Sequence, residues 1–147
     1  MTLAAVKPQT QPAHSFPIRV YYEDTDAGGI VYYANYLKFA ERARTEMLRD
    51  AGFHHTAMMT AEGIVLAVRR CSAEYMRPAK LDDQLDVTTL VRALGAATIE
   101  LDQSIRRGAE ELCQIAVTIA CVGRDGRPVR LPAAMRQALN LTLPEEK

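Results

Sequence analysis

The sequence predicts an α+β domain in which one long helix covers one face of a curved antiparallel sheet. Residues 36–51 place apolar side chains at three- and four-residue spacing, which is typical of an amphipathic helix. After residue 63 the chain is rich in β-branched residues, and most segments alternate apolar with polar positions, as strands do. Mostly short turns join these segments, which favours antiparallel neighbours.

The elements follow one another along the chain without an internal repeat or a low-complexity segment. A mobile, polar N-terminal tail is expected over residues 1–15, before a single domain over residues 16–142. We expect these elements in order: a strand at 16–22, a turn at 23–29, the helix at 36–51, a short helix or irregular excursion at 53–62, strands at 64–76, 85–93, 99–106 and 113–121, and a helix at 133–141.

The apolar face of the long helix includes two small residues, Ala40 and Ala43. Small residues let a helix lie close against a sheet. A single helix covers one face of the sheet only, so the open face and an edge strand need further cover. A second subunit is the simplest cover.

Composition restricts the class of protein. The 147 residues correspond to one ordinary domain, and 18 basic against 18 acidic residues give a net charge of zero. This balance argues against a nucleic-acid partner or a membrane surface. The three cysteines are scattered and include no CxxC pair, which fits a reduced compartment. Because no apolar run reaches the ~18–20 residues of a membrane span, we expect no integral membrane segment and a cytoplasmic location.

The most informative segment joins the first strand to the long helix. Asp26 stands at the hinge, directly before Ala27, Gly28 and Gly29. A carboxylate beside backbone N–H groups near a helix start can attack or deprotonate on one side and stabilise an oxyanion on the other. Taken alone, the motif fits a helix cap better, which is a common role for Asp.

The residues that follow Asp26 are candidates for substrate contact. Gly28 and Gly29 allow close backbone approach, so the N–H groups from Gly29 through Ile30 to Tyr33 are candidates to polarise a carbonyl.

The aromatic residues around this segment have less uniform roles. Tyr33 is expected to line a substrate pocket, and Tyr22 fits a pocket and ordinary packing equally. Tyr36 is expected to pack in the core. Asn35 would either orient water or cap the helix, and capping is favoured because Asn is a common N-cap residue.

Other candidate sites are weaker. A calcium loop would need an oxygen ligand at Gly28 and a Glu at Asn35, so it is rejected. His54 and His55 lack the spacing of metal ligands, and no metal site is expected. The cysteines are expected to fill the core. The basic candidates for binding phosphate groups are Arg69, Arg70, Arg77 and a cluster of Arg124, Arg127 and Arg130.

Residues 22–36 resemble the active-site signature of the 4-hydroxybenzoyl-CoA thioesterase family of hotdog-fold proteins. Residues 41–48, 74–79 and 81–83 are similar to the YbgC-type branch, the acyl-CoA thioesterases associated with the Tol–Pal system. The resemblance implies a five-stranded antiparallel sheet wrapped around the long helix, with Asp26 as the catalytic carboxylate. It also implies a homodimer or homotetramer with active sites at the dimer interface and no metal or redox cofactor.

The chain departs from the YbgC-type branch at one position. That branch typically carries His where this chain has Tyr33, whereas the 4-hydroxybenzoyl-CoA branch carries Tyr. The sequence therefore allows either a short aliphatic or an aromatic acyl group in the substrate. It also allows the thioester to be carried by coenzyme A or by an acyl carrier protein. The expected function is acyl-CoA hydrolysis with Asp26 as nucleophile or general base. The alternative is a non-hydrolysing protein that binds coenzyme A or an acyl carrier, or a Tol–Pal accessory protein.

Overall fold

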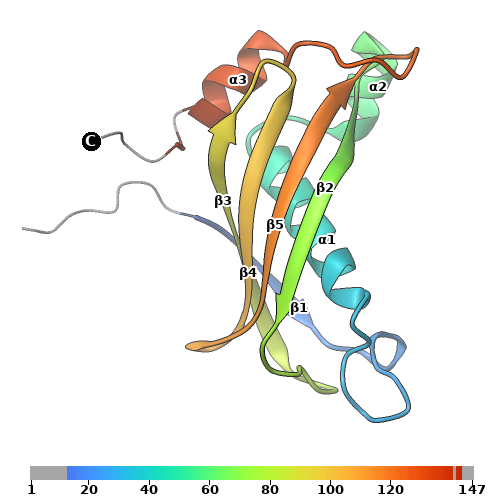
Figure 1. The fold of residues 1–147 in the computed structure, drawn as a ribbon, viewed down its shortest axis with the longest axis vertical. Helices are drawn as coiled ribbons and strands as arrows, with labels where there is room; N and C mark the ends of the chain where they lie inside the picture. The colour runs from blue at the N-terminus through green and yellow to red at the C-terminus, as the bar shows by residue number, and fades with distance from the viewer. Residues whose placement is uncertain (1–12, 141, 144–147) are drawn as a thin grey trace, which may run out of the picture.

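The sheet and the long helix form a hotdog fold, as predicted (Figure 1). The computed structural model describes residues 13–140, 142 and 143. Five antiparallel strands lie in the order β1-β3-β4-β5-β2 and curve around α1. The elements are β1 (His14–Arg19), a 3-10 helix (Tyr22–Asp24), α1 (Asn35–Asp50), α2 (His55–Glu62), β2 (Val65–Tyr75), β3 (Gln84–Leu94), β4 (Thr98–Arg107), β5 (Glu110–Val122) and α3 (Ala133–Asn140).

The first strand begins earlier than predicted and ends earlier. β1 starts at His14, inside the expected tail, because His14 and Ser15 pair with Thr89 and Thr88 of β3. Its predicted last residue, Tyr22, instead opens the 3-10 helix. The chain turns there because Asp24 binds back to the preceding backbone. The rest of the predicted tail, residues 1–12, lies outside the described residues.

The strand order corrects the expectation that successive strands are neighbours. β3, β4 and β5 do pair in sequence through short turns. β2, however, pairs with β5 at one edge of the sheet, and β1 pairs with β3 at the other edge. The β2–β3 connection, residues 76–83, therefore crosses the end of the sheet (Figure 1).

The small residues of α1 lie against the sheet, as predicted. Ala40 and Ala43 are fully buried. Between them and the sheet lies a buried polar side chain, Gln103 of β4, whose Nε2 donates to the Ala40 carbonyl at 2.9 Å and to the Thr89 hydroxyl at 2.9 Å. Its Oε1 accepts from Arg44 at 3.3 Å. Because a buried amide needs these partners, the contact sets the position of α1 along the sheet.

β2 is an edge strand whose helix-facing side is only partly covered. Val68 and Tyr75 are 50% and 45% exposed, although their β5 partners Ile119 and Cys113 are buried. The register slips between Val68 and Arg70, so Arg69 is the extra residue of a β-bulge. An exposed apolar edge of this kind is suited to pairing with another chain.

Tyr36 packs in the core, as predicted, and also supports the β2–β3 connection. Its ring is 4% exposed, and its hydroxyl accepts a hydrogen bond from the Ala79 N–H at 2.9 Å. The Ala79 carbonyl accepts in turn from the Val31 N–H at 2.9 Å. Burial raises the pKa of Tyr36, so the phenol is held in its neutral form.

Tyr36→Phe is expected to lower the free energy of unfolding by about 1–3 kcal/mol, because the buried Ala79 N–H loses its acceptor. The deficit relative to wild type should shrink above about pH 10. The pKa of Tyr36 is higher in the folded than in the unfolded protein, so the folded protein keeps the phenol neutral at a pH where the unfolded chain already ionises it. Ionisation therefore stabilises the unfolded chain, and the stability that Tyr36 adds to wild type decreases as the pH rises. Urea unfolding from pH 8 to 11 measures both effects.

Tyr22→Phe is the control, since Tyr22 is 81% exposed and should change stability by less than about 0.5 kcal/mol. Equal stability of Tyr36→Phe and wild type at pH 8 would contradict a stabilising role of the Tyr36–Ala79 hydrogen bond.

Candidate active site

Asp26 lies at the tip of a tight hairpin, not at the start of α1. Its N–H donates to the Ile30 carbonyl at 2.9 Å, and its carbonyl accepts from the Gly29 N–H at 3.0 Å. Its Oδ1 accepts from the Gly28 N–H at 2.8 Å. Gly29 has a φ of +82°, which glycine adopts without strain. Helix capping by Asp26 is therefore wrong, because α1 begins nine residues later and Ala34 stands at its N-cap.

The hairpin uses most of the backbone N–H groups that were candidates for an oxyanion site. Gly29, Val31 and Tyr32 donate to the carbonyls of Asp26, Ala79 and Asp24. Among the described residues, the N–H groups of Ile30 and Tyr33 have no such partner. Tyr33 directly precedes the N-cap residue of α1, where the positive end of the helix dipole lies.

The aromatic side chains around the hairpin lie on the surface of the single chain. Tyr33 is 62% exposed and packs edge-on against Tyr75 with ring centroids 6.0 Å apart. Tyr75 also contacts the buried Tyr36, with centroids 5.5 Å apart. Tyr33, at the start of α1, thus meets the end of β2. Tyr22 points away from the core.

Asn35 does not cap the helix, and its side chain makes a contact that was not predicted. It is the first residue of α1 and is buried, and its Nδ2 donates to Oδ1 of Asp24 at 2.9 Å. It makes no capping hydrogen bond. The sequence pattern does not predict this contact of Asp24. Its acidic neighbours gave no signal to separate Asp24 from the exposed acids beside it.

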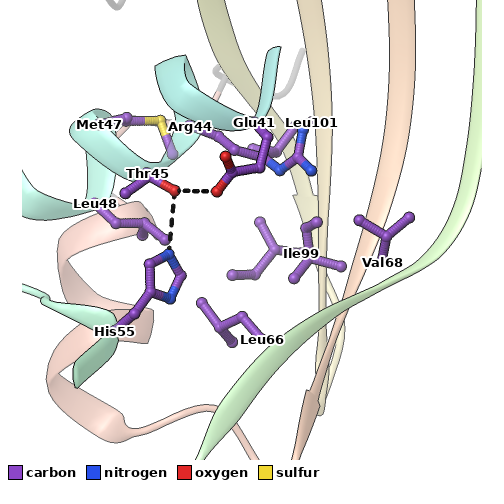
Figure 2. A pocket seen from close by; sticks show the side chains of 11 residues that line it. Glu41, Arg44, Thr45, Met47, Leu48, His55, Leu66, Val68, Ile99 and Leu101 are labelled. Carbon is purple, nitrogen blue, oxygen red and sulfur yellow. Dashed lines mark hydrogen bonds between the residues drawn. The ribbon is translucent and has the colours of Figure 1, made fainter. Parts of the chain in front are cut away.

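A mainly apolar cavity of about 140 Å³ lies between α1, α2 and the sheet (Figure 2). Leu66 and Val68 of β2 line the cavity, and because Val68 is 50% exposed we take the β2 side as its open side. Ile99 of β4 lines it from the sheet. The remaining lining residues are Glu41, Arg44, Thr45, Met47, Leu48, His55, Leu101 and Ile119. The sequence gives no local signal for this cavity, because its walls come from five separate elements.

One wall of the cavity is polar. The Thr45 hydroxyl donates to Oε2 of Glu41 at 2.8 Å and lies 3.3 Å from Nε2 of His55 (Figure 2). Burial lowers the pKa of Arg44.

In a single subunit, the cavity and the Asp26 hairpin lie toward opposite ends of β2. The cavity is lined by Leu66 and Val68 near the start of β2, whereas Tyr33 contacts Tyr75, the last residue of β2. No residue of the Asp26 hairpin lines the cavity. A site that uses both would need two copies of the chain.

The arginines proposed for phosphates do not form one cluster. Arg69 and Arg70 are exposed on β2, at and beside the bulge. Arg77 follows β2 and pairs with Glu110, with Nε and Oε2 3.2 Å apart. The loop arginines lie at the opposite end of the molecule, where Arg127 pairs with Asp125.

The cysteines match their predicted role in part. Cys113 and Cys121 are buried, and burial raises the pKa of Cys113 to about 12, so this thiol stays neutral. Cys71 is exposed on β2. Among residues 13–140, 142 and 143, no three His, Cys, Asp or Glu side chains gather as a metal site would require. None of the helices in this range has the length and apolar character that crossing a membrane requires.

Comparison with known proteins identifies the family. The model of the thioesterase-like superfamily matches residues 20–139. The chain belongs to this superfamily. The predicted family and the predicted class of enzyme, a thioester hydrolase, are thereby confirmed.

Individual members of the superfamily support this. The chain is 42% identical over 127 residues to acyl-CoA thioesterase YbgC of Haemophilus influenzae, covering 86% of this chain and 93% of the relative. It is 45% identical over 108 residues to acyl-CoA thioester hydrolase YbgC of Escherichia coli, covering 73% and 80%. The crystal structure of a probable thioesterase from Bartonella henselae is 40% identical, with a TM-score of 0.79, covering 82% of this chain and 99% of that one.

Gly29→Ala is expected to lower the free energy of unfolding by about 1–2 kcal/mol, because an L-residue is strained in the left-handed region. Gly28→Ala is the matched variant. Its φ is not positive, and its new Cβ would lie 3.3 Å from Oδ1 of Asp26, an exposed atom that can turn away. Its cost should stay below about 0.5 kcal/mol. Urea unfolding measures both, and equal costs would contradict the backbone assignment.

Proposed function

We propose that this protein hydrolyses the thioester of a short-chain or single-ring acyl-CoA, with Asp26 as nucleophile or general base. The observation that carries the proposal is the exposed Asp26 carboxylate, held in a tight hairpin whose second arm leads to the open N–H of Tyr33. Relatives at 42% and 45% identity named as acyl-CoA hydrolases support the substrate class.

The proposed chemistry requires water and a carboxylate, with no metal or redox cofactor. As nucleophile, Asp26 attacks the thioester carbon, the C–S bond breaks, and water then hydrolyses the mixed anhydride. As general base, Asp26 takes a proton from the water that attacks the same carbon. Either route gives the free acid and the coenzyme A thiol.

The carbonyl oxygen gains negative charge in either route, and we assign its stabilisation to backbone donors. The Tyr33 N–H is the first choice because it has no internal partner among the described residues and stands at the positive end of α1. The Ile30 N–H is the second. Gly28 and Gly29 then act by shaping the hairpin, because their own N–H groups bind Asp26.

A homodimer completes the proposed site. Identical edges paired about a two-fold axis run antiparallel, so the end of β2 in one copy meets the start of β2 in the other. This pairing brings the Asp26 hairpin and Tyr33 of one copy to the open side of the partner's cavity. It also covers the exposed Val68 and Tyr75. A homotetramer would be two such dimers.

The cavity volume restricts the acyl group. An apolar cavity of about 150 Å³ accommodates a benzene ring, and this one measures about 140 Å³. A short aliphatic or single-ring acyl group fits this space, whereas a long chain does not. We assign to Tyr22, which is exposed beside the hairpin, a contact with the part of the substrate that lies outside the cavity.

Fewer observations indicate where the thiol-bearing part of the substrate binds. Arg69, Arg70 and Arg77, spaced along β2, are the candidates for the phosphates of coenzyme A. An acyl carrier protein would present the same thioester on a protein surface. A cytoplasmic location is part of the proposal, since both carriers occur there.

Asp26→Asn is expected to lower turnover at least about 100-fold, because an amide neither attacks the carbonyl nor accepts the proton. The measurement is thiol release, followed with a thiol-reactive dye, over acyl-CoAs from acetyl and butyryl through benzoyl to palmitoyl. Glu23→Gln, an exposed acid of the same segment, is the control and should keep wild-type turnover. Wild-type rates in Asp26→Asn would rule out the Asp26 mechanism, and a palmitoyl preference would rule out the cavity as acyl pocket.

Subunit complementation tests the shared site. Asp26→Asn lacks the carboxylate, and Val68→Trp fills the open side of the cavity, so each variant alone should be inactive. Differently tagged copies expressed together should regain about one quarter of wild-type turnover, because half of the dimers are mixed and each has one complete site. No recovery in purified mixed dimers would place Asp26 and the cavity of the same copy in one site. A monomer in sedimentation would exclude the shared site.

A further inference from the structure

Asp24 is a buried carboxylate that the proposed reaction does not use. It is 3% exposed, although Glu23 and Asp26 beside it are exposed. Its Oδ2 accepts from the Tyr21 N–H at 2.8 Å, and its Oδ1 accepts from Nδ2 of Asn35 at 2.9 Å. Both carboxylate oxygens therefore have a specific partner.

The surroundings of Asp24 are unusual for a buried charge. Burying an ionised carboxylate is costly unless it is paired or well hydrogen-bonded. Among the described residues, Asp24 forms no ion pair. Its partners are neutral donors, and one of them is the first residue of α1, where the helix dipole favours negative charge.

The backbone of Asp24, like its side chain, is hydrogen-bonded both to Tyr21 and to the chain that leads into α1. Its carbonyl accepts from the Tyr32 N–H at 2.9 Å, and its N–H donates to the Tyr21 carbonyl at 3.0 Å. Asp24 thus links the chain before the Asp26 hairpin to the chain after it. Tyr33, the proposed oxyanion donor, lies between Tyr32 and Asn35, two of the residues that Asp24 holds.

We propose that Asp24 is a positioning residue that fixes the Asp26 carboxylate relative to the Tyr33 N–H by hydrogen-bonding to Asn35. The proposal rests on the proposed function, in which these two groups act on the same carbonyl. At 3% exposed, Asp24 is too buried to contact substrate directly. Its effect is on geometry, and a displacement of about 1 Å in a catalytic group lowers turnover about 100-fold.

The test exchanges the two partners. Asn35→Asp alone sets two carboxylates against each other at a buried contact of 2.9 Å. We expect kcat per folded enzyme to fall about tenfold or more, with KM within about threefold, because the lost geometry matters in the transition state. Adding Asp24→Asn restores a complementary pair, since the amide at position 24 donates to the carboxylate at position 35 and its oxygen accepts from Tyr21. The double variant should return to within about threefold of wild-type kcat.

Controls separate positioning from stability. The folded fraction of each variant is measured by urea unfolding at the assay temperature, and kcat is normalised to it. Met135→Ala, a buried residue of α3, should lose about 2–4 kcal/mol of stability but keep wild-type kcat per folded enzyme. If Asn35→Asp does not fold, Asn35→Ala replaces it, because it removes the donor without adding charge.

Three outcomes would overturn the inference. Wild-type kcat per folded enzyme in both Asn35 variants would show that the contact does not position the site. A double variant no more active than Asn35→Asp would show that the pair does not act through its hydrogen bond. Asp26→Asn is assayed beside them. If it keeps wild-type turnover, the proposed function fails together with the inference, whereas an inactive Asp26→Asn with active Asn35 variants rejects the inference alone.

Discussion

The close contact between α1 and the curved sheet is the constraint on which the other features depend. Ala40 and Ala43 have no bulk to hold the helix away, and both are fully buried. The Gln103 amide, which donates to the Ala40 carbonyl, fixes where along the sheet the helix lies. With that position fixed, the N-terminal end of α1 meets the Asp26 hairpin, and its C-terminal half forms a wall of the cavity.

The Asp26 hairpin is rigid because it is bonded on two sides to structure that is itself buried. On one side the Val31 N–H binds the Ala79 carbonyl, and the Ala79 N–H binds Tyr36 inside the core. On the other side Asp24 joins the hairpin to the start of α1 through Asn35. An exposed carboxylate on a well-supported turn can meet substrate without losing its geometry, which is the arrangement that preorganised catalysis requires.

The uncovered edge strand connects the two halves of the proposed site. α1 covers the middle of the sheet but leaves the helix-facing side of β2 partly open, with Val68 half exposed. The same strand has the cavity at its start and the Tyr33–Tyr75 contact at its end. Antiparallel pairing of two such edges would cover the apolar surface and bring the two functional groups together in one step.

The sequence by itself determined the fold class, the position of each element to within a few residues, and the glycine-containing turn that carries Asp26, because spacing, alternation and glycine placement are local properties. The tertiary structure decided the strand order, since pairing of β2 with β5 depends on a connection without a short-turn signal. It separated the buried Asp24 from the exposed Asp26, two acids that look alike in the sequence. It assembled the cavity from α1, α2 and three strands, because burial and long-range contacts exist only once distant segments have packed together.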